Sequence, residues 1–145
     1  MPSYSNSKSL LAILLSITFS LTACQKAVPP IFKHGGSGNA HVYVAGYESN
    51  GTNNVAKYWM DSTEILLSNG NNEAKANSIF VSGNDVYIAG SDNGAVYWKN
   101  NAEIRLSGSN ASSIYVSGND IYVGGSDTSS NGPNAVYWKN GKKFG

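Results

Sequence analysis

Short apolar segments alternate with turn-forming residues along most of the chain. Three of these segments, Ile79–Val81, Val86–Ile88 and Val96–Trp98, are apolar at every position, which is typical of strands covered on both faces. In Glu103–Leu106 the apolar residues occupy only alternate positions, which favours an edge strand with one face in water. The pair Gly83-Asn84 provides the backbone freedom that a two-residue hairpin turn needs. The pattern predicts a meander of four antiparallel strands.

This pattern is repeated. Residues 78–92 return almost unchanged at 113–127, and Tyr-Trp pairs stand at 58–59, 97–98 and 137–138. Spacings of about 40 residues with four strands in each unit favour an all-β fold of the β-propeller type, in which each unit forms one blade. A β-solenoid or a small sandwich is the alternative.

The repeated phrase also carries a family resemblance. Ser113-Ile-Tyr-Val-Ser-Gly-Asn-Asp-Ile-Tyr-Val, followed by Tyr137-Trp-Lys-Asn-Gly, resembles the tandem β-propeller-type repeats of bacterial surface lipoproteins. The resemblance covers residues 42–145. Kelch repeats are a looser comparison, because only Gly124-Gly125 supplies the glycine doublet and Tyr adjoins Trp in every unit. No kelch function is carried over.

The number of repeats predicts an open or incomplete ring. The chain holds three copies of the second and third strands but only two full copies of the first and fourth, so we expect about two and a half to three blades. Propellers close with roughly four to eight blades. The chain would then be a truncated piece of a longer protein, an open array, or one part of a ring completed by self-assembly. We favour truncation, because the sequence stops inside a repeat.

The first 23 residues are typical of a lipoprotein signal peptide. An apolar run at 10–21 is too short to cross a bilayer, and Leu21-Thr-Ala-Cys24 resembles the lipobox at which Cys24 is acylated, as by palmitate, and becomes the first residue. An ordinary leader, or an uncleaved anchor with a free thiol, is the alternative. Gln25 is not the aspartate linked to inner-membrane retention, so in a Gram-negative cell the resemblance implies anchoring in the outer membrane. Residues 24–40 contain Pro29-Pro30 and several glycines, which favours a flexible tether before repeats at 41–145.

Composition excludes several functions. Ten Lys and Arg balance nine Asp and Glu for a net charge of +1, so a basic nucleic-acid groove is not expected. The single cysteine excludes an internal disulfide. The only histidines, His34 and His41, have no third ligand at a recognisable spacing, so we interpret them as solvated linker residues and expect no metal.

Four acidic residues recur from unit to unit and are the first candidates for chemistry. Acid–base catalysis or calcium binding would use such carboxylates, but recurrence beside turns and strand ends favours a turn former that bonds nearby backbone. These residues are Asp85, Asp92, Asp120 and Asp127. The repeats also lack a Gly-x-Ser-x-Gly elbow and a phosphate-binding glycine loop, so we expect no catalytic residue and no cofactor.

The recurring Tyr-Trp pairs have two interpretations. They could form a row of sugar-stacking platforms, or they could pack between neighbouring sheets. Their regularity favours core packing for Trp, and less firmly for Tyr, whose hydroxyl could reach a surface.

Length varies at one connection, and this is where we expect specificity. The link from Gly46 to Tyr58 spans 12 positions, that from Gly90 to Tyr97 spans 7, and that from Gly125 to Tyr137 spans 12. Variable loops on a rigid scaffold are the usual location of binding, although loops this polar could equally be simple turns. The candidate binding residues are Glu48, Asn50, Asn53, Asp127, Ser130, Asn131 and Asn134.

These observations favour a non-enzymatic, membrane-anchored module of the cell envelope that binds a protein or glycan partner. Two alternatives stay open: a vestigial fragment without activity, and part of an enzyme whose catalytic blades are missing.

Overall fold

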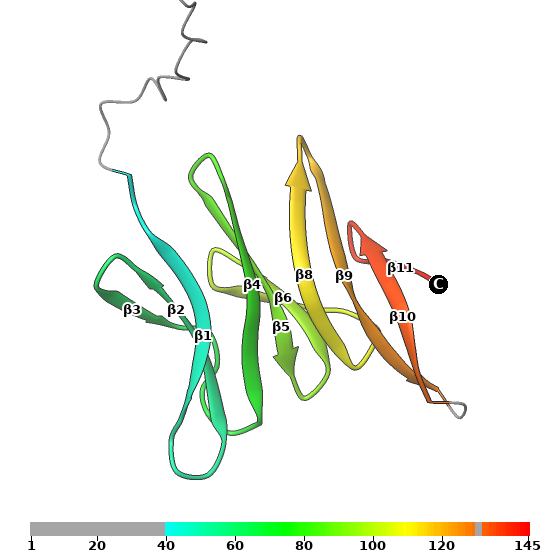
Figure 1. Cartoon of the computed structure of the whole chain (residues 1–145), viewed down its shortest axis with the longest axis horizontal. Coiled ribbons are helices and arrows are strands. Elements are labelled where there is room, and N and C mark those ends of the chain that lie inside the picture. Colours follow the sequence, from blue (N-terminus) through cyan, green and yellow to red (C-terminus); the bar gives the residue numbers. More distant parts are fainter. Residues whose placement is uncertain (1–39, 130–131) are drawn as a thin grey trace, which may run out of the picture. The chain divides into compact units, whose positions relative to one another are not determined.

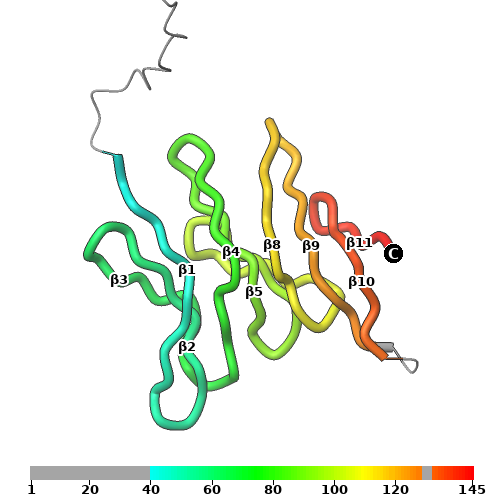
Figure 2. The backbone as a smooth tube through the Cα atoms, viewed as in Figure 1, coloured from blue at the N-terminus to red at the C-terminus, as the bar shows by residue number. Residues whose placement is uncertain are grey.

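The computed structural model describes residues 40–129 and 132–145, which belong to one compact unit (Figures 1 and 2). This part of the chain is built from strands and contains no helix, as the repeat pattern predicts. Among the same residues, therefore, no helix is long and apolar enough to cross a membrane. The strands are β1 (Tyr43–Ser49), β2 (Asn54–Met60), β3 (Thr63–Leu66), β4 (Ala74–Ser82), β5 (Asp85–Asp92), β6 (Ala95–Lys99), β7 (Ala102–Arg105), β8 (Asn110–Ser117), β9 (Asp120–Ser129), β10 (Gly132–Lys139) and β11 (Lys142–Phe144).

The strands form three antiparallel meanders. The first sheet has the order β1-β2-β3, the second β4-β5-β6-β7, and the third β8-β9-β10-β11. The four-stranded meander is therefore confirmed in the second and third sheets, and Glu103 and Arg105 lie on an edge strand as expected. The third sheet does contain a fourth strand, although β11 has only three residues. The sheets are open and do not close on one another within the described residues.

The turns use the residues that the sequence pattern singles out. Gly83 and Gly118 adopt φ of 60° and 58° between paired strands, a conformation that glycine takes without strain. In the β6–β7 turn, Asn100 and Asn101 both have positive φ, which matches the right-handed twist of the strands they join. Consecutive turns alternate between two ends of each sheet. We call the end with the β4–β5 and β8–β9 turns the turn edge, and the end with the β1–β2, β5–β6 and β9–β10 connections the loop edge (Figure 1).

The recurring glycine of the second strand has a packing role. In the second sheet a β-bulge shifts the register between Ala76 and Ser78, opposite Gly90. A Cβ atom on Gly90 would lie 2.0 Å from the Lys75 carbonyl oxygen and 2.8 Å from Trp98 Cζ3. The third sheet repeats this arrangement at Gly125. These positions accept only glycine because the neighbouring strand, β4 or β8, and an indole ring both approach the backbone closely.

Each sheet has two different faces, and the strand registers show which face of one sheet is equivalent to which face of another. One face carries the tryptophan of the Tyr-Trp pair, as Trp98 in the second sheet, and we call it the indole face. The other carries the tyrosine, as Tyr97, and we call it the phenol face. Trp59 and Trp138 occupy the indole-face position of the first and third sheets, because they pair at the same register as Trp98.

The core lies between the sheets, where an indole face packs on the phenol face of the preceding sheet. Tyr58 of the first sheet clusters with Ile88, Val96 and Trp98 of the second. The phenol face of the second sheet packs in the same way against the third; the residues of that cluster include Tyr87, Ala89, Tyr97, Ile114, Val123, Val136 and Trp138. Trp98 and Trp138 are 0% exposed. The core interpretation is therefore confirmed for these two tryptophans, whereas Trp59, on the outer face of the first sheet, is only partly buried.

Candidate binding surfaces

The recurring acids at the turn edge belong to a side-chain network. Asp85 Oδ1 accepts a hydrogen bond from Asn100 Nδ2 at 2.7 Å, and Asp85 Oδ2 lies 2.9 Å from Lys99 Nζ and 3.2 Å from the Tyr87 hydroxyl. Asn100 Oδ1 in turn accepts from the backbone N–H of Val86 at 2.9 Å. The network joins the β4–β5 turn to the β6–β7 turn. We call it the turn network.

The third sheet repeats the turn network. Asp120 lies 2.8 Å from both Asn140 Nδ2 and Lys139 Nζ, and it accepts from the Tyr122 hydroxyl at 3.3 Å. Turn stabilisation by these acids agrees with the expectation from sequence, but the partners do not: both aspartates bind side chains of a neighbouring hairpin, and not nearby backbone. The expectation missed the Lys-Asn half of the network, although Lys-Asn follows Tyr-Trp at both positions.

Electrostatics hold these carboxylates in the charged form. The hydrogen bond from Asn100, together with the nearby Lys99 ammonium, lowers the pKa of Asp85. The Lys139 ammonium and then Asn140 lower the pKa of Asp120 in the same way. Contact with Asp120 raises the pKa of Lys139. Both pairs are therefore ionised at neutral pH, and their hydrogen-bonding capacity is used in joining two turns.

The first sheet carries an exchanged version of this network. By register, His41 stands where the other sheets have Asp85 and Asp120, and Asp61 stands where they have Asn100 and Asn140. His41 Nδ1 and Asp61 Oδ2 are 2.7 Å apart, and Asp61 Oδ1 accepts from the Val42 N–H at 3.0 Å. His41 is exposed, as the sequence predicts, but its contact with Asp61 makes it part of the first sheet's network, so its interpretation as a linker residue is wrong. His34 lies outside the described residues.

Asp92 and Asp127 are the other two recurring acids. Asp92 is buried and accepts from Asn72 Nδ2 at 3.2 Å, while its carbonyl oxygen accepts from Arg105. Asp127 forms an ion pair with Lys143 and accepts from the Thr128 N–H at 2.9 Å. The described residues contain no group of three His, Cys, Asp or Glu side chains that could hold a metal ion.

The candidate residues of the β1–β2 hairpin contact their own scaffold. Asn50 Oδ1 accepts from the N–H groups of Thr52 and Asn53, both at 2.9 Å. The Nδ2 atoms of Asn50 and Asn53 each donate to the Gly70 carbonyl at 3.1 Å. Glu48, the penultimate residue of β1, forms an ion pair with Lys57 Nζ at 2.8 Å. This hairpin is held in one shape, while its backbone tip at Gly51 and Thr52 stays exposed.

The β9–β10 connection is an extended hairpin and not a long loop. Strand pairing continues through Asn134 with Asp127, Pro133 with Thr128 and Gly132 with Ser129. The prediction of a long loop from the Gly125–Tyr137 spacing is therefore wrong, because the number of residues alone does not distinguish a loop from two longer strands. Thr128 is fixed further by a 2.8 Å hydrogen bond to Ser109. The candidates Ser130 and Asn131 lie outside the described residues.

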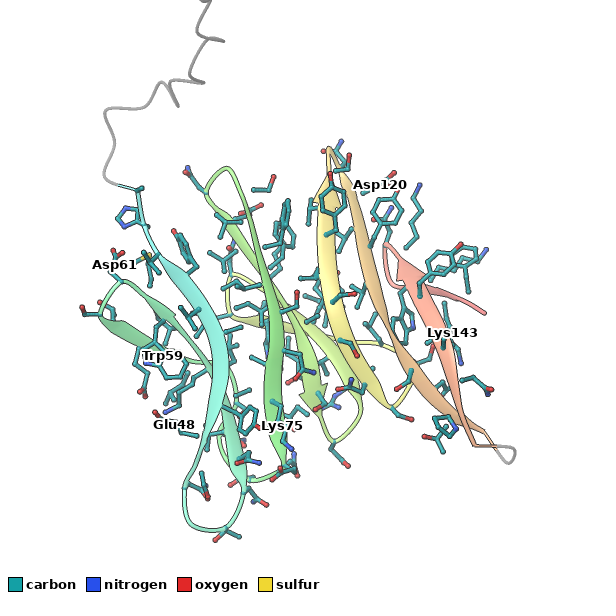
Figure 3. The ribbon with its side chains drawn as sticks, in the orientation of Figure 1. Glu48, Trp59, Asp61, Lys75, Asp120 and Lys143 are labelled. Carbon is teal, nitrogen blue, oxygen red and sulfur yellow. The ribbon has the colours of Figure 1, made fainter. Side chains whose placement is uncertain are left out.

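One more buried charge distinguishes the first sheet. Lys57 occupies the indole-face position of Val96 and Val136, and its side chain is only 7% exposed. Its ammonium lies 2.8 Å from Glu48 Oε2 and 3.0 Å from Glu64 Oε1, and the hydrogen bond that Lys57 donates to Glu48 raises the pKa of Lys57. Trp59 lies beside this cluster, with its ring centroid 5.9 Å from Lys57 Nζ (Figure 3). The strand alternation gives no indication of this substitution, since a lysine between Ala56 and Tyr58 resembles any solvent-facing position.

No pocket is found over the described part of the chain. Comparison of the chain with protein-family models, curated proteins and solved structures found no significant match in any of the three. The predicted acylation site, Cys24, lies outside the described residues, as do the predicted leader and all of the predicted tether except Ala40.

Proposed function

We propose that this chain is a lipid-anchored cell-envelope protein with β-propeller-type repeats, and that it binds a protein or glycan partner without catalysing a reaction. The antiparallel meanders and the stacking of unlike faces support the propeller type. The use of Asp85 and Asp120 within the turn network supports a scaffold role for the residues that are the first candidates for acid–base chemistry.

The observation that carries the binding role is the unequal length of three equivalent hairpins on one edge. The β5–β6 hairpin turns directly after Asp92, whereas β1–β2 and β9–β10 continue beyond that point. The sheets below them follow one plan, so the loop edge is where the units differ most. A fixed scaffold that presents variable polar hairpins is the usual arrangement of a recognition surface.

Deleting the tip of one hairpin tests the binding role. Shortening Asp127–Asn134 to the length of Ser91–Gly94 should leave the rest of the third sheet intact, because it removes only the outermost β9–β10 pairs and the contacts of Asp127 and Thr128, while Ser126 still pairs with Ala135. We expect glycan-array or pull-down signals to be lost. The matched control is Asp120→Asn, which alters the opposite edge. The proposal is wrong if the wild type gives no signal, or if the control loses its signal while the shortened hairpin keeps it.

The anchoring has its own test. Cys24→Ser should prevent incorporation of labelled palmitate and release the protein from membrane fractions, because acyl chains supply about 0.8 kcal/mol for each buried methylene. A wild-type protein that is soluble, unlabelled and still carries its leader would contradict the proposed anchor.

A further inference from the structure

The two end sheets expose opposite halves of the interface that holds the sheets together. The first sheet packs its phenol face on the second sheet, so its indole face is uncovered within the described residues. The third sheet packs its indole face on the second, so its phenol face is uncovered. Figure 3 shows Trp59 on the first sheet and Lys143 on the third, at the two ends of the row.

Exposure at equivalent positions marks these two faces as unpartnered. On the indole faces, Ile88 is 1% exposed, whereas Val44 at the same register is 50% exposed. On the phenol faces, Tyr97 is 8% exposed, whereas Tyr137 is 50% exposed. Among the described residues, every exposed large apolar side chain except Tyr47 belongs to one or the other face: Val42, Val44 and Leu66 to the first sheet, and Tyr115, Tyr137 and Phe144 to the third. Of these, Tyr115 also contacts Phe80 of the second sheet, with the ring centroids 5.1 Å apart.

Charges on the two end faces are complementary. On the first sheet, Glu48 and Glu64 surround the single ammonium of Lys57, which leaves an excess of negative charge. On the third sheet, Asp120 pairs with Lys139 at 2.8 Å, so the excess positive charge of the phenol face is that of Lys142, whose Nζ lies 5.4 Å from the Phe144 ring. Apposed surfaces with opposite charge favour the matched contact over contact of like faces.

We propose that two copies of this chain pair head to tail, the indole face of the first sheet in one copy packing on the phenol face of the third sheet in the other. The same chain already forms this kind of contact twice, between its first and second sheets and between its second and third. A second copy of the chain would therefore present the kind of face that each uncovered face contacts elsewhere in the structure. Anchoring and partner binding are not needed for this contact.

The contact is heterologous, because the two copies contribute different faces to it. Such contacts form a closed ring when the rotation between subunits closes, and open fibres when it does not. Two copies of the three described sheets would give six, within the roughly four to eight blades of propellers, whereas three copies would give nine, so we expect a closed pair. This step, unlike the contact itself, rests on the propeller type proposed above.

The test uses paired charge substitutions in the full chain, purified in detergent and analysed by native mass spectrometry. Val44→Asp changes only the first end face and Tyr137→Asp only the other. Each variant alone should weaken the dimer at least about tenfold, because each alters both contacts of a closed pair. An equimolar mixture should partly recover the dimer, because a Tyr137→Asp copy still has a native first face and a Val44→Asp copy still has a native last face. Tyr47→Asp is the control, since Tyr47 is 47% exposed but lies on neither end face, and it should leave the dimer unchanged.

A photo-crosslinking residue at position 137 gives an independent readout in intact membranes. We expect crosslinks to residues 42–46 or 57–66 of a second copy, and none from the same residue at position 47. A monomeric wild type overturns the proposal. So does a dimer that only one of the two substitutions weakens, since that result indicates pairing of like faces. Open polymers larger than two copies would also overturn it, and the wild-type circular dichroism spectrum in every variant would show that these losses are not caused by unfolding.

Discussion

Alanine at Gly90 should destabilise the protein, whereas alanine at the equivalent Gly46 should not. A Cβ at Gly90 would lie 2.0 Å from the Lys75 carbonyl oxygen, where a carbon–oxygen contact needs about 3.3 Å or more. The bulged strand β4 must therefore move by more than about 1 Å. A Cβ at Gly46 would meet only Trp59 ring atoms, the nearest at 3.0 Å, and this ring is partly exposed and free to shift.

The expected magnitudes follow from these contacts. Overpacking of a tight site costs about 1–3 kcal/mol, and the loss of one ladder hydrogen bond adds about 1 kcal/mol, so Gly90→Ala should cost roughly 2–4 kcal/mol. For a domain of this size that corresponds to a fall in melting temperature of at least about 8 °C. Gly46→Ala should change the free energy of unfolding by no more than about 0.5 kcal/mol, because alanine also restricts the unfolded chain.

Equilibrium urea unfolding of the two variants, followed by tryptophan fluorescence, measures this difference. Gly125→Ala provides an internal repeat, since its Cβ would lie 2.1 Å from the Asn110 carbonyl oxygen. Equal losses at Gly46 and Gly90 would refute the reasoning, because they would show that glycine is needed for the conformation of its own strand and not for the close approach of β4.

Three further predictions concern the core and the turn network. Trp98→Ala should cost about 3–5 kcal/mol in chemical denaturation, and a variant with an unchanged midpoint would contradict burial of the indole between two sheets. Trp138→Phe should cost about 1 kcal/mol more than Trp98→Phe. Trp138 Nε1 donates to the Ser107 carbonyl at 3.2 Å, whereas Trp98 Nε1 has no partner among the described residues. Equal melting temperatures of the two variants would argue against this bond. The pKa values of Asp85 and Asp120 are lowered in the folded state, so their stabilisation is complete above the ordinary aspartate pKa of about 3.9 and is lost as the pH falls through the lower folded values. Asp85→Asn combined with Asp120→Asn should flatten the dependence of the unfolding midpoint on pH below about 4, and an unchanged acid limb would contradict it.

Strands, turns and the tryptophan core are predictable from sequence because each is specified locally. The pair Gly83-Asn84 fixes a turn wherever it occurs between two apolar runs, and Trp98 follows the same alternation as Val96. The registers between strands are not specified locally, and this is why the exchange of His41 and Asp61 was missed. Only the pairing of β1 with β2 brings these two residues to the positions of Asp85 and Asn100.

The candidate binding residues were predicted in part. Their polarity and their variable spacing indicate the loop edge, and the structure does place Asn50 and Asn53 at a hairpin tip. The same polarity does not reveal that these amides are used in holding the Gly70 carbonyl. Lys57 also escaped prediction, because its burial depends on Glu48 and Glu64 from two other strands.

The difference between the two faces of each sheet has a consequence for how many repeats a chain of this kind can hold. Residues 78–92 and 113–127 are so alike that a further copy of this segment would carry the same strand and turn pattern. Every sheet has one indole face and one phenol face, so an added repeat meets a matching neighbour on both sides. A hydrogen bond between sheets also fixes how far one sheet is shifted along its strands relative to the next. Asn77 Nδ2, in the bulge of β4, donates to the Ala111 carbonyl oxygen of the following sheet at 2.8 Å. A chain with more or fewer repeats would therefore keep the same contacts between sheets and present the same two kinds of surface on its end sheets.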